Sequence, residues 1–177
     1  MAWHPEHKKN SKNRILTSAA NLFSQHGYDK VAIDDVMGAA QLTRGAFYSH
    51  FKSKSELYSK ALIHAAKLRA NQVNDSYDAE DIRQFYLADE HVNAEHAGCP
   101  LAFLVSDISH RDEQVRATYT AVLNNILTKL ENTGLTRTAA IHQALMMIAT
   151  VAVSRAITDE SLKEELLTVG RQSPQHE

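Results

Sequence analysis

The pattern of apolar and polar positions is helical along the whole chain. Near the N-terminus, Ile15, Ala19, Leu22 and Phe23 recur at the spacing of one helical face, which predicts a helix over 11–26. We find no segment that alternates apolar and polar residues with the two-residue period of a strand. Proline (3) and glycine (6) are scarce, which favours a helical protein over a sandwich or barrel. The sequence therefore predicts an all-α protein with about nine helices.

Two short helices joined by a tight turn are predicted over 33–40 and 44–50. Thr43 stands at the N-cap position of the second short helix. Ser53 and Glu56 have the spacing of a capping box, so a long helix is expected to begin there. Together these elements predict a three-helix, helix-turn-helix arrangement at the start of the chain.

The remaining apolar patterns predict a further series of helices. Their expected ranges are 79–93, 100–110, 113–134, 137–157 and 161–169. The segment 139–157 is apolar on nearly every side and should be buried on more than one side. Met1–Lys12 is expected to form a flexible, cationic arm.

Charge is distributed unevenly along the chain, although the net charge is only −2. Residues 1–60 carry nine Lys or Arg and five Asp or Glu, whereas the remainder carries ten and sixteen. A basic N-terminal part favours a polyanion partner at that end of the molecule. No run approaches the roughly 20 apolar residues of a membrane span, and the N-terminus has no signal-peptide pattern. With a single cysteine, a cytoplasmic location and no membrane partner are expected.

The second short helix has the residues of a helix that enters a DNA groove. Gly45 and Ala46 keep its front slim, and Phe47 and Phe51, four positions apart, should face the core together. This arrangement leaves an exposed set consisting of Thr43, Arg44, Tyr48 and Ser49.

The exposed side chains suit both base edges and phosphates. Arg44 has the geometry for a bidentate contact with guanine, and Thr43 and Tyr48 can bond phosphates. His50, Lys52 and Lys54 gather at the start of the following helix, where free N–H groups also attract phosphate. Spacing alone favours a plain helical hairpin with solvated charges over a DNA-binding motif.

The segment 14–57 resembles the N-terminal domain of TetR-type (TetR/AcrR) transcriptional regulators. The residues that carry the resemblance are Ala19, Ala20, Leu22, Phe23, Gly27, Tyr28, Val36, Ala40 and the run LTRGAFYSHFKSKSEL. Three positions depart from the family's pattern. Ala32 replaces the usual Ser or Thr cap, Met37 a small residue, and Gln41 the usual turn glycine. The cap of the first short helix is therefore expected to be weaker.

The resemblance implies two domains, a helix-turn-helix DNA-binding domain over 1–52 and a helical ligand-binding and dimerisation domain over 53–177. It implies a homodimer that pairs through the last two helices. Such a dimer would bind a near-palindromic double-stranded DNA operator. It also implies release of a repressor from that operator by a small-molecule effector of unknown identity.

Four residues are candidates for the ligand pocket or sensor: Cys99, Phe103, Tyr119 and Met146. Ordinary core packing is the commoner role for residues of these types, including a free cysteine. Cys99 precedes Pro100 at a predicted helix start, where the helix N-terminus is expected to lower the thiol pKa. The segment around it also resembles TetR-type regulators that respond to electrophiles or oxidants. A trigger by modification of Cys99 is therefore a second hypothesis beside effector binding.

The alternative interpretation is a helical metal- or cofactor-binding protein that uses the stretch from Glu90 to Cys99. This stretch holds mixed donors at helical spacing, namely Glu90, His91, Glu95, His96 and Cys99. The preferred interpretation, a DNA-binding regulator, includes no bound metal ion and no cofactor. An enzyme is not expected, since the chain has no Gly-rich phosphate loop, nucleophile elbow or HExxH motif.

Overall fold

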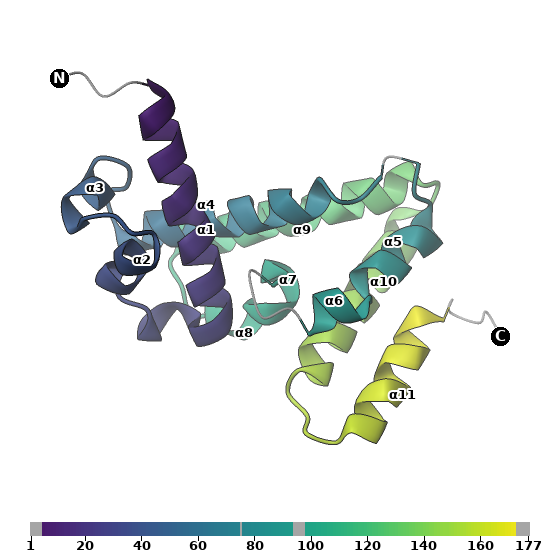
Figure 1. Cartoon of the computed structure of the whole chain (residues 1–177). Helices are drawn as coiled ribbons and strands as arrows, with labels where there is room; N and C mark the ends of the chain where they lie inside the picture. Colours follow the sequence, from purple (N-terminus) through teal and green to yellow (C-terminus); the bar gives the residue numbers. More distant parts are fainter. Residues whose placement is uncertain (1–4, 75, 94–97, 173–177) are drawn as a thin grey trace.

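The computed structural model describes residues 5–74, 76–93 and 98–172, and in these ranges it contains only helices (Figure 1). The all-α prediction is confirmed, with eleven described helices in place of about nine. They are α1 (Pro5–Lys30), α2 (Ile33–Ala39), α3 (Arg44–Tyr48), α4 (Lys54–Ala70), α5 (Ala79–Tyr86), α6 (Asp89–Val92), α7 (Pro100–Phe103), α8 (Val105–Ile108), α9 (Glu113–Asn132), α10 (Arg137–Ser154) and α11 (Glu160–Arg171). None of them is both long and apolar enough to cross a membrane.

Two predicted helices are each divided in the structure. The helix expected over 79–93 breaks at Leu87, whose backbone leaves the helical region at φ −98° and ψ 13°. Arg171 donates two hydrogen bonds to the Leu87 carbonyl, at 3.1 and 2.8 Å, which stabilises the break. The helix expected over 100–110 breaks in the same way at Leu104 (φ −121°, ψ 6°). Contacts from distant segments stabilise such breaks, so sequence periodicity does not reveal them.

The expectation of a flexible arm over Met1–Lys12 is wrong for the described residues, because α1 already begins at Pro5. Ser11 is buried, and its hydroxyl lies 2.9 Å from Nε2 of His50. This contact attaches the start of α1 to the end of α3. Residues 1–4 lie outside the described part of the chain.

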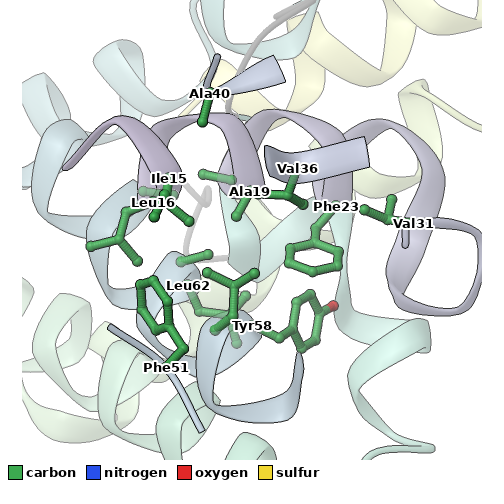
Figure 2. Packing of buried hydrophobic residues seen from close by; sticks show 14 of the residues in the cluster. Ile15, Leu16, Ala19, Phe23, Val31, Val36, Ala40, Phe51, Tyr58 and Leu62 are labelled. Atoms are coloured by element: carbon green, nitrogen blue, oxygen red, sulfur yellow. The ribbon is translucent and has the colours of Figure 1, made fainter. Parts of the chain in front are cut away.

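A first core joins α1, α2, α3 and α4. Figure 2 shows Ile15, Ala19 and Phe23 of α1 facing Tyr58 and Leu62 of α4. The rings of Phe23 and Tyr58 meet edge to face, with centroids 4.7 Å apart. This packing places α1 and α4 against each other and supports the small helices α2 and α3.

A second core lies among α5, α7, α9, α10 and α11. Leu130 of α9, Met147 and Val151 of α10, and Leu167 of α11 are almost fully buried in it. Gly170 allows α11 to approach α10 closely, since a Cβ at this position would lie 2.7 Å from Oγ1 of Thr150. Helix α4 runs beside α9 away from the N-terminal helices (Figure 1), so it belongs to both halves of the molecule.

Asp107 of α8 joins the C-terminal part of the chain to α1 and α4 through hydrogen bonds. Its Oδ2 accepts a hydrogen bond from the hydroxyl of Tyr58 at 2.5 Å and one from the backbone N–H of Tyr28 at 3.3 Å. Nearby, Arg111 forms a bidentate ion pair with Asp29, with both N–O distances 2.8 Å. The end of α1, the start of α4 and the α8–α9 segment therefore meet at one polar joint.

Gln41 follows α2 with φ +52°, a left-handed conformation that is unfavourable for a residue with a Cβ. This is the position at which TetR-type sequences usually have glycine. We predict that Gln41→Gly raises the free energy of unfolding by about 0.5–1 kcal/mol, measured by urea denaturation. The gain is limited because glycine also increases the freedom of the unfolded chain.

Gly38→Asn is a suitable control, because Gly38 lies inside α2 with no heavy atom within 4 Å of a built Cβ and has no positive φ. A substitution at Gly38 does not change the strain of a left-handed residue. It should therefore not reproduce the stabilisation expected from Gln41→Gly. An equal or lower stability of Gln41→Gly would contradict the proposed backbone strain.

Candidate DNA-contacting surface and ligand cavity

The first candidate site is the front of α3. Phe47 is fully buried and its ring packs near that of Phe51, with centroids 5.7 Å apart. Because Phe47 faces the core, the opposite side of α3 faces solvent, and Tyr48 is 62% exposed. Thr43, Arg44, Gly45 and Ser49 are also exposed, whereas Ala46 is half-buried. The structure therefore places the predicted DNA-contacting residues of α3 on one accessible face.

The caps of α2 and α3 differ from the usual pattern. Thr43 occupies the N-cap of α3 with an extended backbone, but its side chain makes no capping hydrogen bond. At α2, Ala32 has no side chain that can cap, as the sequence indicated. Asp35 partly compensates, because its carboxylate accepts a hydrogen bond from the Ala32 N–H at 2.7 Å.

Arg44 is the strongest candidate for reading a base. Its guanidinium forms an ion pair with Asp34 of α2 at 3.0 Å, and the two side chains are 62% and 60% exposed. Exposed ion pairs are weak because water and salt screen them. Arg44 can therefore exchange Asp34 for a guanine edge at little cost.

The three predicted phosphate contacts are in different environments. Lys52 is exposed. The ammonium of Lys54 lies 4.2 Å from the centroid of the Tyr28 ring, and burial lowers its pKa. Burial also lowers the pKa of His50, and the charges of Lys8 and Lys12 lower it further. Of the three, Lys52 is the side chain placed most openly for a phosphate.

Sequence reasoning missed two residues at this surface. Lys8 and Gln41 line a shallow depression in front of α3, together with Leu42, Thr43, Gly45, Ala46 and Ser49. Lys8 was assigned to a flexible arm, and only the early start of α1 brings it to α3. Its position in the cationic run before Arg14 was the available signal.

The second candidate site is a cavity of about 300 Å³ between α4, α5, α7 and α9. Its lining is mostly apolar and consists of Ile63, Ala66, Lys67, Arg69, Ala70, Val73, Ile82, Phe85, Tyr86, His91, Cys99, Pro100, Leu101, Ala121, Val122, Asn125, Ile126 and Lys129. A volume near 300 Å³ lies at the lower end of the range for small-molecule sites.

The four candidate pocket residues lie in three places. Cys99 lines the cavity. Phe103 and Tyr119 pack beside it: the Arg155 guanidinium lies 3.7 Å from the Phe103 ring centroid, and the Tyr119 hydroxyl donates to the Leu101 carbonyl at 2.8 Å. Met146 is 47% exposed on α10 and is not among the lining residues.

The environment of Cys99 opposes the expected thiolate. Cys99 is buried, and its sulfur lies 3.1 Å from the hydroxyl of Tyr86. Burial raises the pKa of the thiol, which outweighs the lowering effects of Tyr86 and of the backbone N–H groups of Leu101 and Ala102. The expected net lowering of this pKa is therefore wrong, because desolvation of the thiol outweighs the effect of the N–H groups at the start of the single-turn helix α7.

His91 is the other buried polar group in the cavity lining. Its Nδ1 bonds to the Tyr86 carbonyl, which can only accept, so Nδ1 carries the proton. Within the described residues, Nε2 has no hydrogen-bond partner. Burial, and then the charge of Arg69, lower the pKa of His91 to about 4. The imidazole is therefore neutral near pH 7.

The metal-binding alternative rests on a stretch that is only partly described. Glu95 and His96 lie outside the described residues. Among the residues that the structure does describe, no three His, Cys, Asp or Glu side chains are grouped to hold a metal ion. His91 and Cys99 instead both contact Tyr86.

Comparison with known families matches the part of the chain that builds the first site. Residues 15–61 match the profile described as "Bacterial regulatory proteins, tetR family". This part of the chain is a TetR-family N-terminal domain. The matched segment covers the helix-turn-helix and the first half of α4, and the family is one of regulatory proteins rather than enzymes.

Curated relatives of the TetR family match over the same segment. The Tn10 TetC protein of Escherichia coli is 44% identical over 54 residues, which are 30% of this chain and 27% of the relative. The negative transcriptional regulator IcaR of the biofilm operon icaADBC in Staphylococcus epidermidis is 29% identical over 79 residues, 42% of each chain. The match therefore spans less than half the length of either relative.

Solved TetR structures share the fold over nearly the whole chain. A TetR regulator from Chloroflexus aurantiacus has a TM-score of 0.71 at 24% identity and covers 94% of both chains. The reduced form of Escherichia coli NemR has a TM-score of 0.72 at 18% identity, with 91% of this chain and 93% of that chain covered. At such low identity, these matches support the fold of the helical body and not its ligand.

We predict that Cys99 reacts slowly with iodoacetamide, since burial limits access and the raised pKa keeps the sulfur protonated. At pH 7.5 the rate should be at least about tenfold lower in the folded protein than in the same protein unfolded in urea. The measurement is alkylation followed by intact-protein mass spectrometry. Equal rates in the two states would restore the reactive-thiolate hypothesis.

Proposed function

We propose that this TetR-family protein is a DNA-binding transcriptional regulator, most consistent with a repressor. The observation that carries the proposal is the face of α3, where Arg44 and Tyr48 are exposed on a helix held by buried Phe47. Relatives that match this segment include the probable acrEF/envCD operon repressor of Escherichia coli and the negative regulator IcaR. Both of these relatives are named as negative regulators, which supports repression rather than activation.

The roles of the surface residues follow from their chemistry. Arg44 would read a guanine in the major groove, with Thr43, Tyr48 and Ser49 beside it on the backbone. Lys52 would bind a phosphate, and Lys8 would add a second cation from α1. His50 would act chiefly by fixing α1 to α3 through Ser11, because its ring is neutral and hydrogen-bonded.

We propose further that the protein forms a homodimer through α10 and α11. In the single chain, α10 exposes Ile141, Leu145 and Val153 at intervals that place them on one face. Helix α11 lies beside it (Figure 1) and exposes Leu162 and Val169. Exposed apolar patches of this kind mark interaction surfaces. A two-fold dimer would present two α3 helices to a near-palindromic operator.

A small-molecule effector in the cavity is the proposed release signal. The cavity lies between α4, which packs on the DNA-binding helices, and α9, which packs on α10. An effector that binds the non-DNA state more tightly must weaken DNA binding by the same factor. Modification of Cys99 is the weaker of the two triggers, because its thiol is buried and protonated.

The DNA-binding proposal predicts distinct effects for two substitutions. With an operator selected from random double-stranded DNA, Arg44→Ala should cost about 1–3 kcal/mol and relax base preference at one position of each half-site. Lys52→Ala should weaken binding to all sequences and reduce the slope of log K against log salt by about one unit per protomer. Both are measured by fluorescence anisotropy at several salt concentrations.

Arg116→Ala is the matched control, since it removes an exposed cation from α9, outside this surface. It should leave affinity and base preference unchanged. Selection of no sequence by the wild-type protein would contradict the proposed function. An equal loss of salt slope from Arg44→Ala and Lys52→Ala would contradict the separate roles.

The dimer proposal predicts that Leu145→Arg dissociates the protein, because two charged side chains would face an apolar surface. Size-exclusion chromatography with light scattering should show a shift from dimer toward monomer, with unchanged helical circular dichroism. Leu68→Arg is the control, since Leu68 is 43% exposed on α4, away from α10 and α11. A wild-type monomer, or a Leu145→Arg dimer, would refute this interface.

A further inference from the structure

The charged residues around the cavity all have the same sign. Lys67, Arg69 and Lys129 are among its lining residues, whereas no Asp or Glu is among those that the structure describes. The rest of the lining is apolar apart from Tyr86, His91, Cys99 and Asn125. A lipophilic cation would therefore meet like charges, and an anion would meet opposite charges.

Arg69 is the cation placed nearest the polar wall of this cavity. Its charge acts on Tyr86, Cys99 and His91, in each case favouring the deprotonated form. Its Nη1 donates to the Gln72 side chain at 3.1 Å, and the guanidinium lies 6.0 Å from the centroid of the Phe85 ring. A guanidinium has five N–H donors, so others remain for a ligand. Glu90, outside the cavity lining, is the carboxylate whose charge reaches Arg69.

Burial makes this guanidinium a stronger partner for a carboxylate than an exposed one. Desolvation is the main influence on Arg69 and lowers its pKa, which shows that water only partly surrounds its charge. Charge-assisted hydrogen bonds from arginine to carboxylate are about twice as strong as neutral ones, and bidentate geometry adds specificity. Beside it, Nε2 of His91 is a buried acceptor without a partner in the described chain. Such an acceptor can pair with a hydroxyl or N–H donor of a ligand.

We propose that the effector is a weakly acidic amphiphile, with an apolar body along α4 and α9 and one carboxyl group directed to Arg69. This inference rests on the proposed role of the cavity as the effector site. The apolar body would lie against Ile63, Ala66, Val122 and Ile126, which line the cavity from these two helices. The carboxylate would lie at the polar side of the cavity, where Arg69 supplies the N–H donors. The charge of Arg69 disfavours a permanently cationic amphiphile of the same length.

Three probes with the same tail test the proposal: octanoate, 1-octanol and octyltrimethylammonium. Isothermal titration calorimetry on the full-length wild-type protein should show octanoate binding about tenfold or more tightly than 1-octanol, and octyltrimethylammonium binding most weakly. In Arg69→Met the advantage of octanoate over 1-octanol should disappear, while the affinity for 1-octanol stays within about a factor of two. Arg69→Lys should retain part of the preference because it keeps the charge.

Two controls locate the effect. Arg116→Met makes the same change on α9 outside the cavity lining and should keep the wild-type order of the probes. Ala121→Phe adds bulk at an exposed lining position and should weaken octanoate and 1-octanol alike. Circular dichroism of each variant verifies the fold.

Each remaining outcome overturns the inference. Octyltrimethylammonium binding as tightly as octanoate would refute the charge preference, and an unchanged preference in Arg69→Met would refute the role of Arg69. No binding of any probe would refute an amphiphile site of this length. DNA binding is measured on the same preparation. A protein that binds DNA but none of the probes would refute the effector proposal and leave the regulator proposal intact.

Discussion

The carboxylate of Asp107 is the contact on which the arrangement of the two halves depends. It accepts from the hydroxyl of Tyr58 in α4 and from the backbone of Tyr28 at the end of α1. Tyr58 is fully buried, so without this acceptor its hydroxyl would lose its hydrogen bond in a desolvated site. Arg111 supports the same joint by pairing with Asp29 and lying 4.7 Å from the Tyr28 ring centroid. These polar contacts, together with buried Leu104, Ile108 and Val115 of the first core, hold the N-terminal helices against the rest of the chain.

The proposed effector site lies close to this joint along the chain. Cys99, Pro100 and Leu101 line the cavity, the backbone breaks at Leu104, and Asp107 follows one turn later. Helix α4 offers a second connection, because it contributes Tyr58 to the joint and Ala66 and Arg69 to the cavity. A ligand changes the DNA-binding state only if it interacts differently with two arrangements of these elements.

Sequence patterns predicted the helix ends wherever local chemistry terminates them. Ser53 caps α4 as expected, whereas Thr43 makes no capping hydrogen bond to α3. Thr136 and Asp159 cap α10 and α11, and Gly134 follows α9 with φ +98°. The break at Leu87 was missed because it depends on Arg171, a partner distant in sequence. The exposed face of α3 could be anticipated from the i, i+4 pair of Phe47 and Phe51. The neutral state of His50 could not, because it depends on Ser11, Lys8 and Lys12 of α1.

The sequence by itself determined the helical class and the resemblance of its N-terminal part to TetR regulators, and it predicted the exposed face of α3, because periodicity, caps and the Thr43–Lys54 motif are local properties. Only the tertiary structure decided the state of Cys99 and the composition of the cavity. A helix start in sequence indicated a lowered thiol pKa, but packing buried the sulfur beside Tyr86, and desolvation reversed the direction. Likewise, Arg69, His91 and Lys129 are far apart in sequence and line one cavity only because α4, α9 and the α5–α6 segment pack together. Burial and long-range charge are properties of the packed chain, which no local pattern specifies.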